Sequence, residues 1–496
     1  MGFAEYDRYD GLGLAELVRK KQVAPAELVD EAIRRIEQYN PMLNVVVHKQ
    51  FERARKQAAG ARPGGPFGGV PFLLKDLMGE DAGEPSTSSC KLLVSWRADR
   101  DAELVARFKR AGVIILGRTN TPEFGIYGVT ESALRGPARN PWDTTRTTGG
   151  SSGGSAGAVA ARMVPLAHGG DGGGSIRIPA SHCGLVGLKP TRARNPAGPF
   201  VGERWGGIVS EHVLTRSVRD CAAMLDATQG PDLGAPYQVL PPTRPFQSEV
   251  GAPVGKLRVA FTAKALFGDG THPDCVTAVE RSAALCRELG HEVEEACPSF
   301  DKATLIKAYL VLVASGVALN VRLAGERAGR RPRPDDFEPA TWLMKLIADK
   351  CTATELAYYR SAMQKAAREI AAFFECYDVL LTPTVAMPPV PIGTYALTDE
   401  QSLLVGLLSA MPLRSLLMLA RDKMAAEALA ATPNTQLWNL TGQPALSLPL
   451  HWSDAGLPIG TQLVGRFGEE GLLLRLGSQL EEARPWATRV PALVKA

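Results

Sequence analysis

One segment of the chain combines residue types suited to acyl-transfer chemistry. Residues 147–191 read TTGGSSGGSAGAVAARMVPLAHGGDGGGSIRIPASHCGLVGLKPT. Serine hydroxyls can act as nucleophiles, and repeated glycines permit tight turns whose N–H groups converge on one point. Each glycine cluster runs directly into an apolar stretch, which is typical of loops held inside a core, whereas a flexible linker lacks such neighbours. We therefore expect the chemistry to lie in this segment.

Two other interpretations compete for the same residues. A phosphate-binding loop needs a lysine after its last glycine, but Gly154 is followed by Ser155 and Ala156. The nucleophile-elbow pattern G-x-S-x-G of α/β-hydrolases occurs three times in overlap, centred on Ser151, Ser152 and Ser155. An elbow also requires a histidine base, and none of the seven histidines is marked out by its local sequence. The elbow remains the alternative mechanism.

Lys75 is the candidate base. It ends the apolar run of GGVPFLLKD, and the two-residue period of a strand would place Lys75 and Asp76 on opposite faces. The carboxylate then need not neutralise the amine. Burial lowers the pKa of a lysine from its reference of ~10.4, and a neutral amine can act as a general base at about pH 7. A lysine that reaches solvent from a strand end is the alternative interpretation.

The hydrophobic pattern predicts an α/β fold. Apolar positions recur at helical spacing over residues 12–39, and Pro41 is expected to end that run. Short strand-like runs such as 70–74 alternate with helix-like segments such as 102–111, which favours a largely parallel sheet. Ser155 is the expected N-cap of a helix that begins AGAVAA.

The organisation along the chain indicates one large domain over residues 1–496, without an internal repeat. Its expected parts are an N-terminal helical part (1–65), a catalytic core (66–230), a connector rich in proline and glycine (231–256), and the remainder of the sheet with helical insertions around 300–430 (257–496). Further strands are expected at 257–261 and in DVLLTPT, PALSLPL and GTQLVG, and further helices at 273–289 and 302–325.

Composition and charge limit the kinds of partner that the protein is expected to bind. Lys and Arg number 56 against 52 Asp and Glu, and a net charge of +4 is too balanced to favour nucleic acid or an anionic membrane. The arginine-rich stretch 325–336 is expected to be a solvated loop, because acidic residues and proline flank its charges. The eight cysteines lack paired or metal-ligand spacing, so we expect reduced thiols, no metal and no cofactor.

The apolar stretches do not predict a membrane protein. The stretch 308–321 is short for a bilayer span, and 402–420 is interrupted by Pro412 and Arg414. The N-terminal sequence lacks a basic region followed by an apolar one, as a secretory signal would have. We expect a cytoplasmic protein that acts on a small molecule. The oligomeric state stays open, with a homodimer among the alternatives.

These residues resemble the amidase-signature hydrolases. The resemblance is carried by GGSSGGS at 149–155, followed by GGDGGGSIRIP at 169–179. It extends over nearly the whole chain through VPFLLKD (70–76), GRTNTPEF (117–124), CGLVGLKPT (183–191), TRSVRD (215–220), LLTPT (380–384), NLTGQPALSLP (439–449) and GLPIGTQLVG (456–465). The resemblance implies a mixed, mostly parallel central sheet covered by helices on both faces.

Carried over position by position, the resemblance implies that Ser175 is the nucleophile, Ser151 a bridging serine with a cis peptide bond, and Lys75 the base. A proton would pass from Ser175 through Ser151 to Lys75. The resemblance further implies oxyanion donors in the backbone N–H groups of Gly172, Gly173, Gly174 and Ser175, and supporting roles for Ser152, Asp171 and Arg177.

One position departs from the pattern of many relatives, which carry a threonine or another side chain where this chain has Gly172. Three successive glycines indicate either a more adaptable loop or a bulkier group on the carbonyl side of the substrate. His168 and His182 lie inside the motif, but the implied relay does not use them, so we expect them to pack or to support the residues that do the chemistry. Cys183 is expected to be a buried small residue rather than a nucleophile.

The resemblance implies a hydrolase of linear amides that acts through an acyl-enzyme. Within the family, AHGxD followed by GSIRIPAS is most similar to enzymes that act on nylon-oligomer amides, anilides and urethanes, which suggests aryl amides, carbamates and esters as substrates. Trp205, Phe200, Tyr127 and the stretch 402–420 are candidates for an apolar pocket, with ordinary core packing as the alternative.

Three other functions remain open at this point. They are a glutamine-hydrolysing subunit of a tRNA-dependent amidotransferase, an esterase of the α/β-hydrolase type, and a catalytically silent binding protein on the same scaffold. The silent protein is disfavoured because Lys75, Ser151 and Ser175 are all present.

Overall fold

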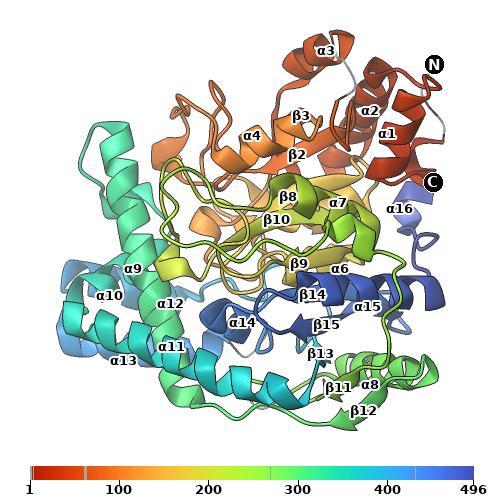
Figure 1. Ribbon diagram of the computed structural model, residues 1–496. Coiled ribbons are helices and arrows are strands. Elements are labelled where there is room, and N and C mark those ends of the chain that lie inside the picture. The colour runs from red at the N-terminus through yellow and green to blue at the C-terminus, as the bar shows by residue number, and fades with distance from the viewer. Residues whose placement is uncertain (1–2, 4, 61–63, 269, 430–431, 496) are drawn as a thin grey trace.

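A single eleven-stranded sheet is the framework of the protein, and segments far apart in the chain contribute neighbouring strands to it (Figure 1). The computed structural model describes residues 3, 5–60, 64–268, 270–429 and 432–495. The strand order is β1-β3-β2-β8-β10-β9-β14-β15-β13-β11-β12. Two short ribbons, β4 with β5 and β6 with β7, lie outside this sheet.

The strands of the large sheet are β1 (Val46–Lys49), β2 (Pro71–Lys75), β3 (Ile114–Thr119), β8 (Leu166–Asp171), β9 (Val186–Lys189), β10 (Ser210–Thr215), β11 (Arg258–Phe261), β12 (Glu292–Glu295), β13 (Val379–Pro383), β14 (Ala445–Trp452) and β15 (Pro458–Gly465). The ribbons are β4 (Glu131–Ser132), β5 (Gly136–Pro137), β6 (Arg139–Asn140) and β7 (Asp143–Thr147). Every residue of β2, β3, β8, β9, β13 and β15 is buried, so both faces of the sheet are covered.

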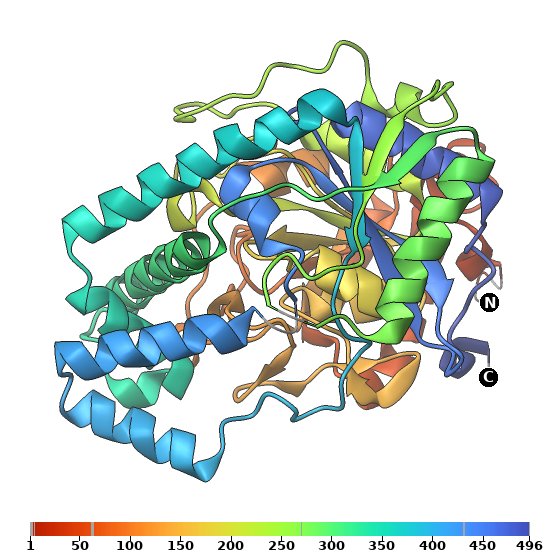
Figure 2. The same ribbon diagram turned by 90° about the horizontal axis from the view of Figure 1, so that it is seen from below.

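The helices are α1 (Gly11–Arg19), α2 (Pro25–Leu43), α3 (Phe51–Ala59), α4 (Glu103–Arg110), α5 (Gly153–Ala160), α6 (Arg177–Cys183), α7 (Val218–Thr228), α8 (Pro273–Glu288), α9 (Lys302–Ala328), α10 (Pro339–Lys350), α11 (Ala353–Cys376), α12 (Asp399–Ala410), α13 (Arg414–Ala428), α14 (Gln436–Thr441), α15 (Glu470–Ala483) and α16 (Ala492–Lys495). Helices α9 to α13 gather to one side of the sheet in both views (Figures 1 and 2).

Alternation along β9 shows how helices cover the two faces. Val186 and Leu188 belong to the apolar cluster that also contains residues of α7 and α15. Gly187, between them, faces α6, where a Cβ on the glycine would lie 2.6 Å from the Cβ of Ala180. Helices α6 and α7 therefore pack on opposite faces of the sheet, as the fold class predicted.

The expectation of a mostly parallel sheet is wrong. Six of the ten neighbouring strand pairs in the described sheet are antiparallel, and four are parallel. Strand β10 follows β9 without an intervening α-helix and inserts between β8 and β9, antiparallel to both. Strands β14 and β15 form a hairpin. Antiparallel neighbours need no helical crossover, so the alternation of element types along the chain could not reveal them.

Two predicted helix boundaries also need correction. Helix α2 continues through Pro41 to Leu43, because the proline lies in the last turn, where little helix remains to be disrupted. Helix α5 begins at Gly153, so Ser155 lies within the helix instead of capping it. The hydroxyl of Ser155 instead donates to the carbonyl oxygen of His168 at 2.7 Å, which fastens α5 to β8.

Helix α9 is the only helix in the described part of the chain with the length and hydropathy of a membrane span. Its most apolar window has a mean hydropathy of 1.7, and 56% of that window is buried inside the fold. Helices α10 and α11 pack against it. Core helices of soluble proteins share this composition, so packing accounts for it.

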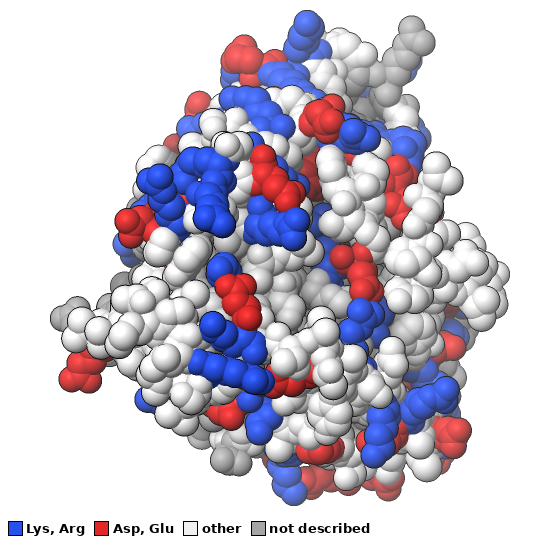
Figure 3. Space-filling model, turned by 90° about the vertical axis from the view of Figure 1, so that its left-hand side faces the viewer, with Lys and Arg blue, Asp and Glu red and all other residues white. Residues whose placement is uncertain are grey.

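Basic and acidic side chains lie next to one another on the face of the molecule to which α9 and α10 belong (Figure 3). The arginine-rich stretch 325–336 is partly helical, because α9 extends to Ala328. Beyond that end, Arg330 Nη1 lies 2.8 Å from Asp336 Oδ2. Most of the stretch is exposed, as expected, but its first part is the end of a helix and its second a paired turn, where a loop was expected.

Candidate active site

Lys75 is the last residue of β2, and its side chain is fully buried. Its Nζ lies 2.6 Å from Ser151 Oγ and 3.5 Å from the carbonyl oxygen of Gly170. Asp76 points away, as the alternation of a strand predicts, and its carboxylate accepts hydrogen bonds from the N–H and the hydroxyl of Thr87. Within the described residues, the amine therefore has a hydroxyl partner and no ion pair.

Burial lowers the pKa of Lys75 to about 7, because the charged ammonium is removed from water. The carboxylates of Asp171 and Glu211 act in the opposite direction but do not offset the burial. A lysine with this pKa has a substantial neutral fraction at about pH 7, whereas an exposed lysine would be almost wholly charged. The amine can therefore accept a proton from the hydroxyl it contacts.

Ser151 lies in the loop between β7 and α5. The peptide bond between Gly150 and Ser151 is cis, as the resemblance implies. A Cβ on Gly150 would lie 2.5 Å from the carbonyl oxygen of Val129 and 2.7 Å from its nitrogen. Only glycine therefore allows the loop to approach the backbone of Val129 this closely.

Ser152 fastens this loop to its neighbours. Its hydroxyl hydrogen-bonds both the carbonyl oxygen and the N–H of Gly170, each at 3.2 Å. Its N–H donates to the carbonyl oxygen of Ser175 at 3.1 Å. Ser152 thus contacts both segments that flank the site, as expected of a supporting residue.

Residues 172–175 form the loop between β8 and α6. The N–H groups of Gly172, Gly173 and Ser175 donate to no other group in the part of the chain that the structure describes. Gly174 differs from the expectation, because its N–H donates to Asp171 Oδ1 at 2.7 Å. A carboxylate three residues earlier in the chain occupies this donor, so Gly174 holds the loop and is not free to bind an oxyanion.

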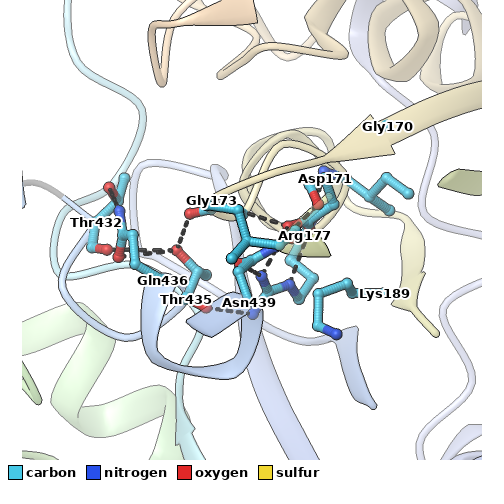
Figure 4. Close-up of polar contacts among 12 residues, drawn as sticks. Gly170, Asp171, Gly173, Arg177, Lys189, Thr432, Thr435, Gln436 and Asn439 are labelled. Atoms are coloured by element: carbon cyan, nitrogen blue, oxygen red, sulfur yellow. Dashed lines mark hydrogen bonds and ion pairs between the residues drawn. The ribbon is translucent and has the colours of Figure 1, made fainter. Parts of the chain in front are cut away.

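The carboxylate of Asp171 and the guanidinium of Arg177 form a fully buried pair beneath this loop (Figure 4). Arg177 donates to Asp171 through Nε at 2.9 Å and Nη2 at 2.8 Å. It also donates to Asn439 Oδ1 at 2.6 Å, Gln462 Oε1 at 2.7 Å and the carbonyl oxygen of Thr435 at 2.9 Å. Burial raises the pKa of Asp171, but Arg177 and Asn439 outweigh it and lower that pKa to about 2.

Lys75, Ser151 and Ser175 line one cavity of about 190 Å³. Ser175 is 8% exposed, so its hydroxyl can be reached from this cavity. No hydrogen bond joins the hydroxyls of Ser151 and Ser175 among the described residues in this conformation. The structure therefore contains the first contact of the expected relay, between Lys75 and Ser151, and places Ser175 at the same cavity.

The rest of the cavity wall is mainly apolar with a few charged groups. The apolar lining includes Leu77, Leu93, Phe124, Phe200, Trp205, Val209, Leu319 and Leu323, and the charged lining comprises Glu80, Glu203, Arg204 and Arg327. Of the pocket candidates named from the sequence, Trp205 and Phe200 line the cavity. Tyr127 and the stretch 402–420 do not contribute to its described lining.

Comparison with known proteins identifies the family. A family model described as Amidase matches residues 27–474. This chain belongs to the amidase-signature family. It is 39% identical to the 6-aminohexanoate-cyclic-dimer hydrolase of Pseudomonas sp. (strain NK87), over 98% of this chain and 97% of that protein.

Two solved structures have the same fold. The 6-aminohexanoate cyclic dimer hydrolase complexed with substrate aligns with a TM-score of 0.90 at 36% identity, covering 98% of this chain and 99% of that one. A bacterial aryl acylamidase of the amidase-signature family aligns with a TM-score of 0.85 at 26% identity, covering 97% of each chain. The protein is accordingly a hydrolase of carbon–nitrogen bonds.

Sequence reasoning expected His168 to pack or to support the site, but it missed Arg118 and Glu211, which help to position the lysine of this amidase. His168 lies behind it, with Nδ1 3.4 Å from the Lys75 backbone nitrogen and Nε2 3.1 Å from Glu211 Oε2. Arg118 donates to the carbonyl oxygens of Lys75 and Gly79, each at 3.1 Å. His168 and Arg118 lie within or beside the family motifs, whereas nothing in the local sequence marks Glu211.

The nucleophile-elbow alternative finds no histidine in this amidase. No described histidine ring hydrogen-bonds Ser151, Ser152 or Ser155. His182 faces the carbonyl oxygen of Met387, and burial lowers its pKa to about 4. Cys183 is fully buried, which raises the pKa of its thiol and makes it a poor nucleophile, as expected.

Proposed function

We propose that this amidase hydrolyses small, uncharged amides through an acyl-enzyme formed on Ser175. The contact of 2.6 Å between Lys75 Nζ and Ser151 Oγ, at a lysine whose pKa burial lowers to about 7, carries the proposal. In this mechanism Lys75 is the base, Ser151 transmits the proton and Ser175 is the nucleophile.

The reaction has two half-reactions, formation of the acyl-enzyme and its hydrolysis, and the proton taken up by Lys75 in each is returned before the half-reaction ends. Neutral Lys75 accepts the Ser151 proton while Ser151 accepts that of Ser175, and Ser175 Oγ bonds to the amide carbon. The same path run backwards protonates the nitrogen, the carbon–nitrogen bond breaks and the amine leaves. Water then repeats the attack on the ester of Ser175 and releases the acid. The mechanism requires a hydrogen bond between the hydroxyls of Ser151 and Ser175, which line the same cavity.

The N–H groups of Gly172, Gly173 and Ser175, which have no acceptor among the described residues, are the proposed donors to the tetrahedral oxyanion. Such a donor commonly contributes about 3 kcal/mol to stabilisation of the transition state, provided that it is fixed before the reaction. Asp171 supplies that fixation through Gly174, whose N–H it binds at 2.7 Å.

The cavity and the relatives support apolar amides as the substrate class. The lining is mainly apolar, so a charged substrate end would lose hydration that few groups replace. The names of two relatives specify a cyclic dimer of 6-aminohexanoate and aryl acylamides. We propose that linear, cyclic and aryl amides are cleaved, and that carbamates and esters with similar apolar groups are accepted at the same serine.

A substrate panel tests the proposal. We expect product release from p-nitroacetanilide, from the cyclic dimer of 6-aminohexanoate, and from a matched aryl ester and carbamate. L-Glutamine belongs in the same panel, because cleavage of glutamine alone would favour an amidotransferase-type subunit. Inactivity of the folded protein on every amide, ester and carbamate would refute the proposal.

Substitutions test the assigned roles. Ser175→Ala should abolish turnover, while Ser248→Ala, at an exposed serine that caps its own turn, is the matched control. Lys75→Ala should reduce kcat/KM by about 10²- to 10⁴-fold at about pH 7 and by less at high pH, where hydroxide replaces the base. A Lys75→Ala variant with full activity, alongside a lethal histidine substitution, would favour the elbow mechanism.

A further inference from the structure

Trp205 has an unusual backbone conformation beside the cavity. It begins the short turn Trp205–Gly207, and its φ of 49° lies in the left-handed region that bulky residues rarely adopt. The next two residues, Gly206 and Gly207, also have positive φ, at 66° and 87°. Packing contacts around the indole must therefore stabilise the backbone in this conformation.

Two glycines make room for the indole on opposite sides. A Cβ on Gly172, in the proposed oxyanion loop, would lie 2.8 Å from Trp205 Cζ3 and 2.9 Å from Cε3. A Cβ on Gly316, in the middle of α9, would lie 2.0 Å from Cδ1 and 2.7 Å from Nε1. The indole therefore fits between the loop and the helix only because both positions lack a side chain.

This packing answers the question raised by the departure at Gly172. The missing side chain does not leave space for a bulkier substrate, because Trp205 fills that space. The ring is nevertheless accessible from the cavity, because Trp205 lines it together with Ser151 and Ser175. Opposite ends of one side chain thus contact the catalytic loop and α9, and the ring itself bounds the space that a substrate must enter.

We propose that Trp205 determines which substrates this amidase accepts, by forming the apolar wall against which the substrate group nearest the carbonyl packs. The inference rests on the proposed amide hydrolysis. A flat, rigid indole favours a slim apolar neighbour, such as an unbranched alkyl chain or the edge of an aryl ring. Branched groups next to the carbonyl are excluded because the ring has no free space to retreat into between its two glycines.

The decisive comparison is between wild type and Trp205→Gly, which removes the ring and tolerates the positive φ. Two substrate series should be used, amides with acyl groups from acetyl to pivaloyl on one amine, and one acyl group on amines of increasing bulk. In one of the two series, we expect the ratio of kcat/KM for bulky substrates to kcat/KM for small substrates to rise at least about 10-fold. A change of this size corresponds to one contact in a hydrophobic pocket. For small substrates, KM should rise more than kcat falls.

A double-mutant cycle with Gly316→Ala separates this role from simple support of the loop. In wild type the new methyl must displace the indole, so Gly316→Ala should change the substrate ratio as well. In the Trp205→Gly background the same substitution should change it by less than about 2-fold, because the atoms it would strike are absent. Gly406→Ala in α12, where a Cβ has open space, is the matched control.

Trp205→Phe provides a second variant if Trp205→Gly fails to fold, and it should retain the wild-type ratio more closely than any non-aromatic residue. Equal loss of kcat on all substrates, with an unchanged ratio in both series, would show that Trp205 only supports the loop and would overturn the inference while the proposed function stood. Wild type inactive on every amide would overturn both together.

Discussion

Replacement of Arg177 by methionine is the most direct test of how the site is held in place. Methionine keeps an unbranched, buried side chain but removes all five side-chain hydrogen bonds of the guanidinium. Asp171 would retain the N–H groups of Gly174 and Ile176 and the amide of Asn439, but no hydrogen-bonded cation. A carboxylate that is 0% exposed would then be left without its charged partner.

Two estimates of the loss agree in order of magnitude. The pKa of Asp171 lies at about 2, against an ordinary 3.8, and at 1.36 kcal/mol per unit this shift corresponds to roughly 2 kcal/mol of stabilisation. Removing one partner of a buried ion pair commonly destabilises a protein by about 3–5 kcal/mol, because the other charge stays buried. We therefore expect Arg177→Met to lower the free energy of unfolding by about 3–5 kcal/mol.

The loss should depend on pH in a definite direction. In wild type the pKa of Asp171 is below its unfolded value of ~3.9, so the carboxylate stabilises the fold above about pH 4, and this stability is lost as pH falls through about 2. Without Arg177, burial raises the pKa of Asp171 above its value in the unfolded chain. The variant is therefore destabilised mainly at higher pH, where the buried carboxyl group would have to be charged. The difference in the free energy of unfolding between wild type and the variant should therefore become smaller as the pH falls from about 7 to about 4.5.

Urea unfolding followed by circular dichroism measures both quantities. Arg322→Met is the matched control, because Arg322 pairs with Glu326 on the surface, at 79% and 56% exposure, and should change stability by less than about 0.5 kcal/mol. Arg177→Lys should recover little, since an ammonium cannot reproduce the planar fork. A loss below about 1 kcal/mol at about pH 7, or a gap that widens on acidification, would refute the reasoning.

Two further predictions concern titration. The kcat/KM of wild type should rise with pH through about 7, because Lys75 must be neutral to act as a base; Glu211→Gln removes a carboxylate that raises this pKa and should move the rise to lower pH. A pH-rate profile checks this, and an unmoved midpoint contradicts it. Burial raises the pKa of Glu123 to about 7, above the value of ~4.3 in the unfolded chain. Wild type therefore loses stability as the pH rises from about 4 to about 7. Glu123→Gln should be more stable than wild type by about 1–3 kcal/mol at about pH 8 and equal at about pH 4, by urea unfolding at each pH; equal stability at both contradicts the assignment.

Local patterns in the sequence determined the elements and most of the residues at the site. Strand-like runs such as 70–74 and helical runs such as 302–325 fold as predicted, in β2 and α9, because apolar periodicity acts within a few residues. The glycine and serine motifs located the loops, because tight turns need glycine at particular backbone angles. Even the separation of Lys75 from Asp76 followed from the two-residue period of a strand.

Only the tertiary structure decided which strands pair, which N–H groups remain free and how far the lysine is buried. Strand β10 inserts between β8 and β9, Asp171 occupies the N–H of Gly174, and Trp205 fills the space left by Gly172. Glu211 approaches the lysine through His168 from a distant part of the chain. Pairing, burial and pKa depend on groups brought together from remote positions, and a one-dimensional pattern of residue types contains no record of their distances.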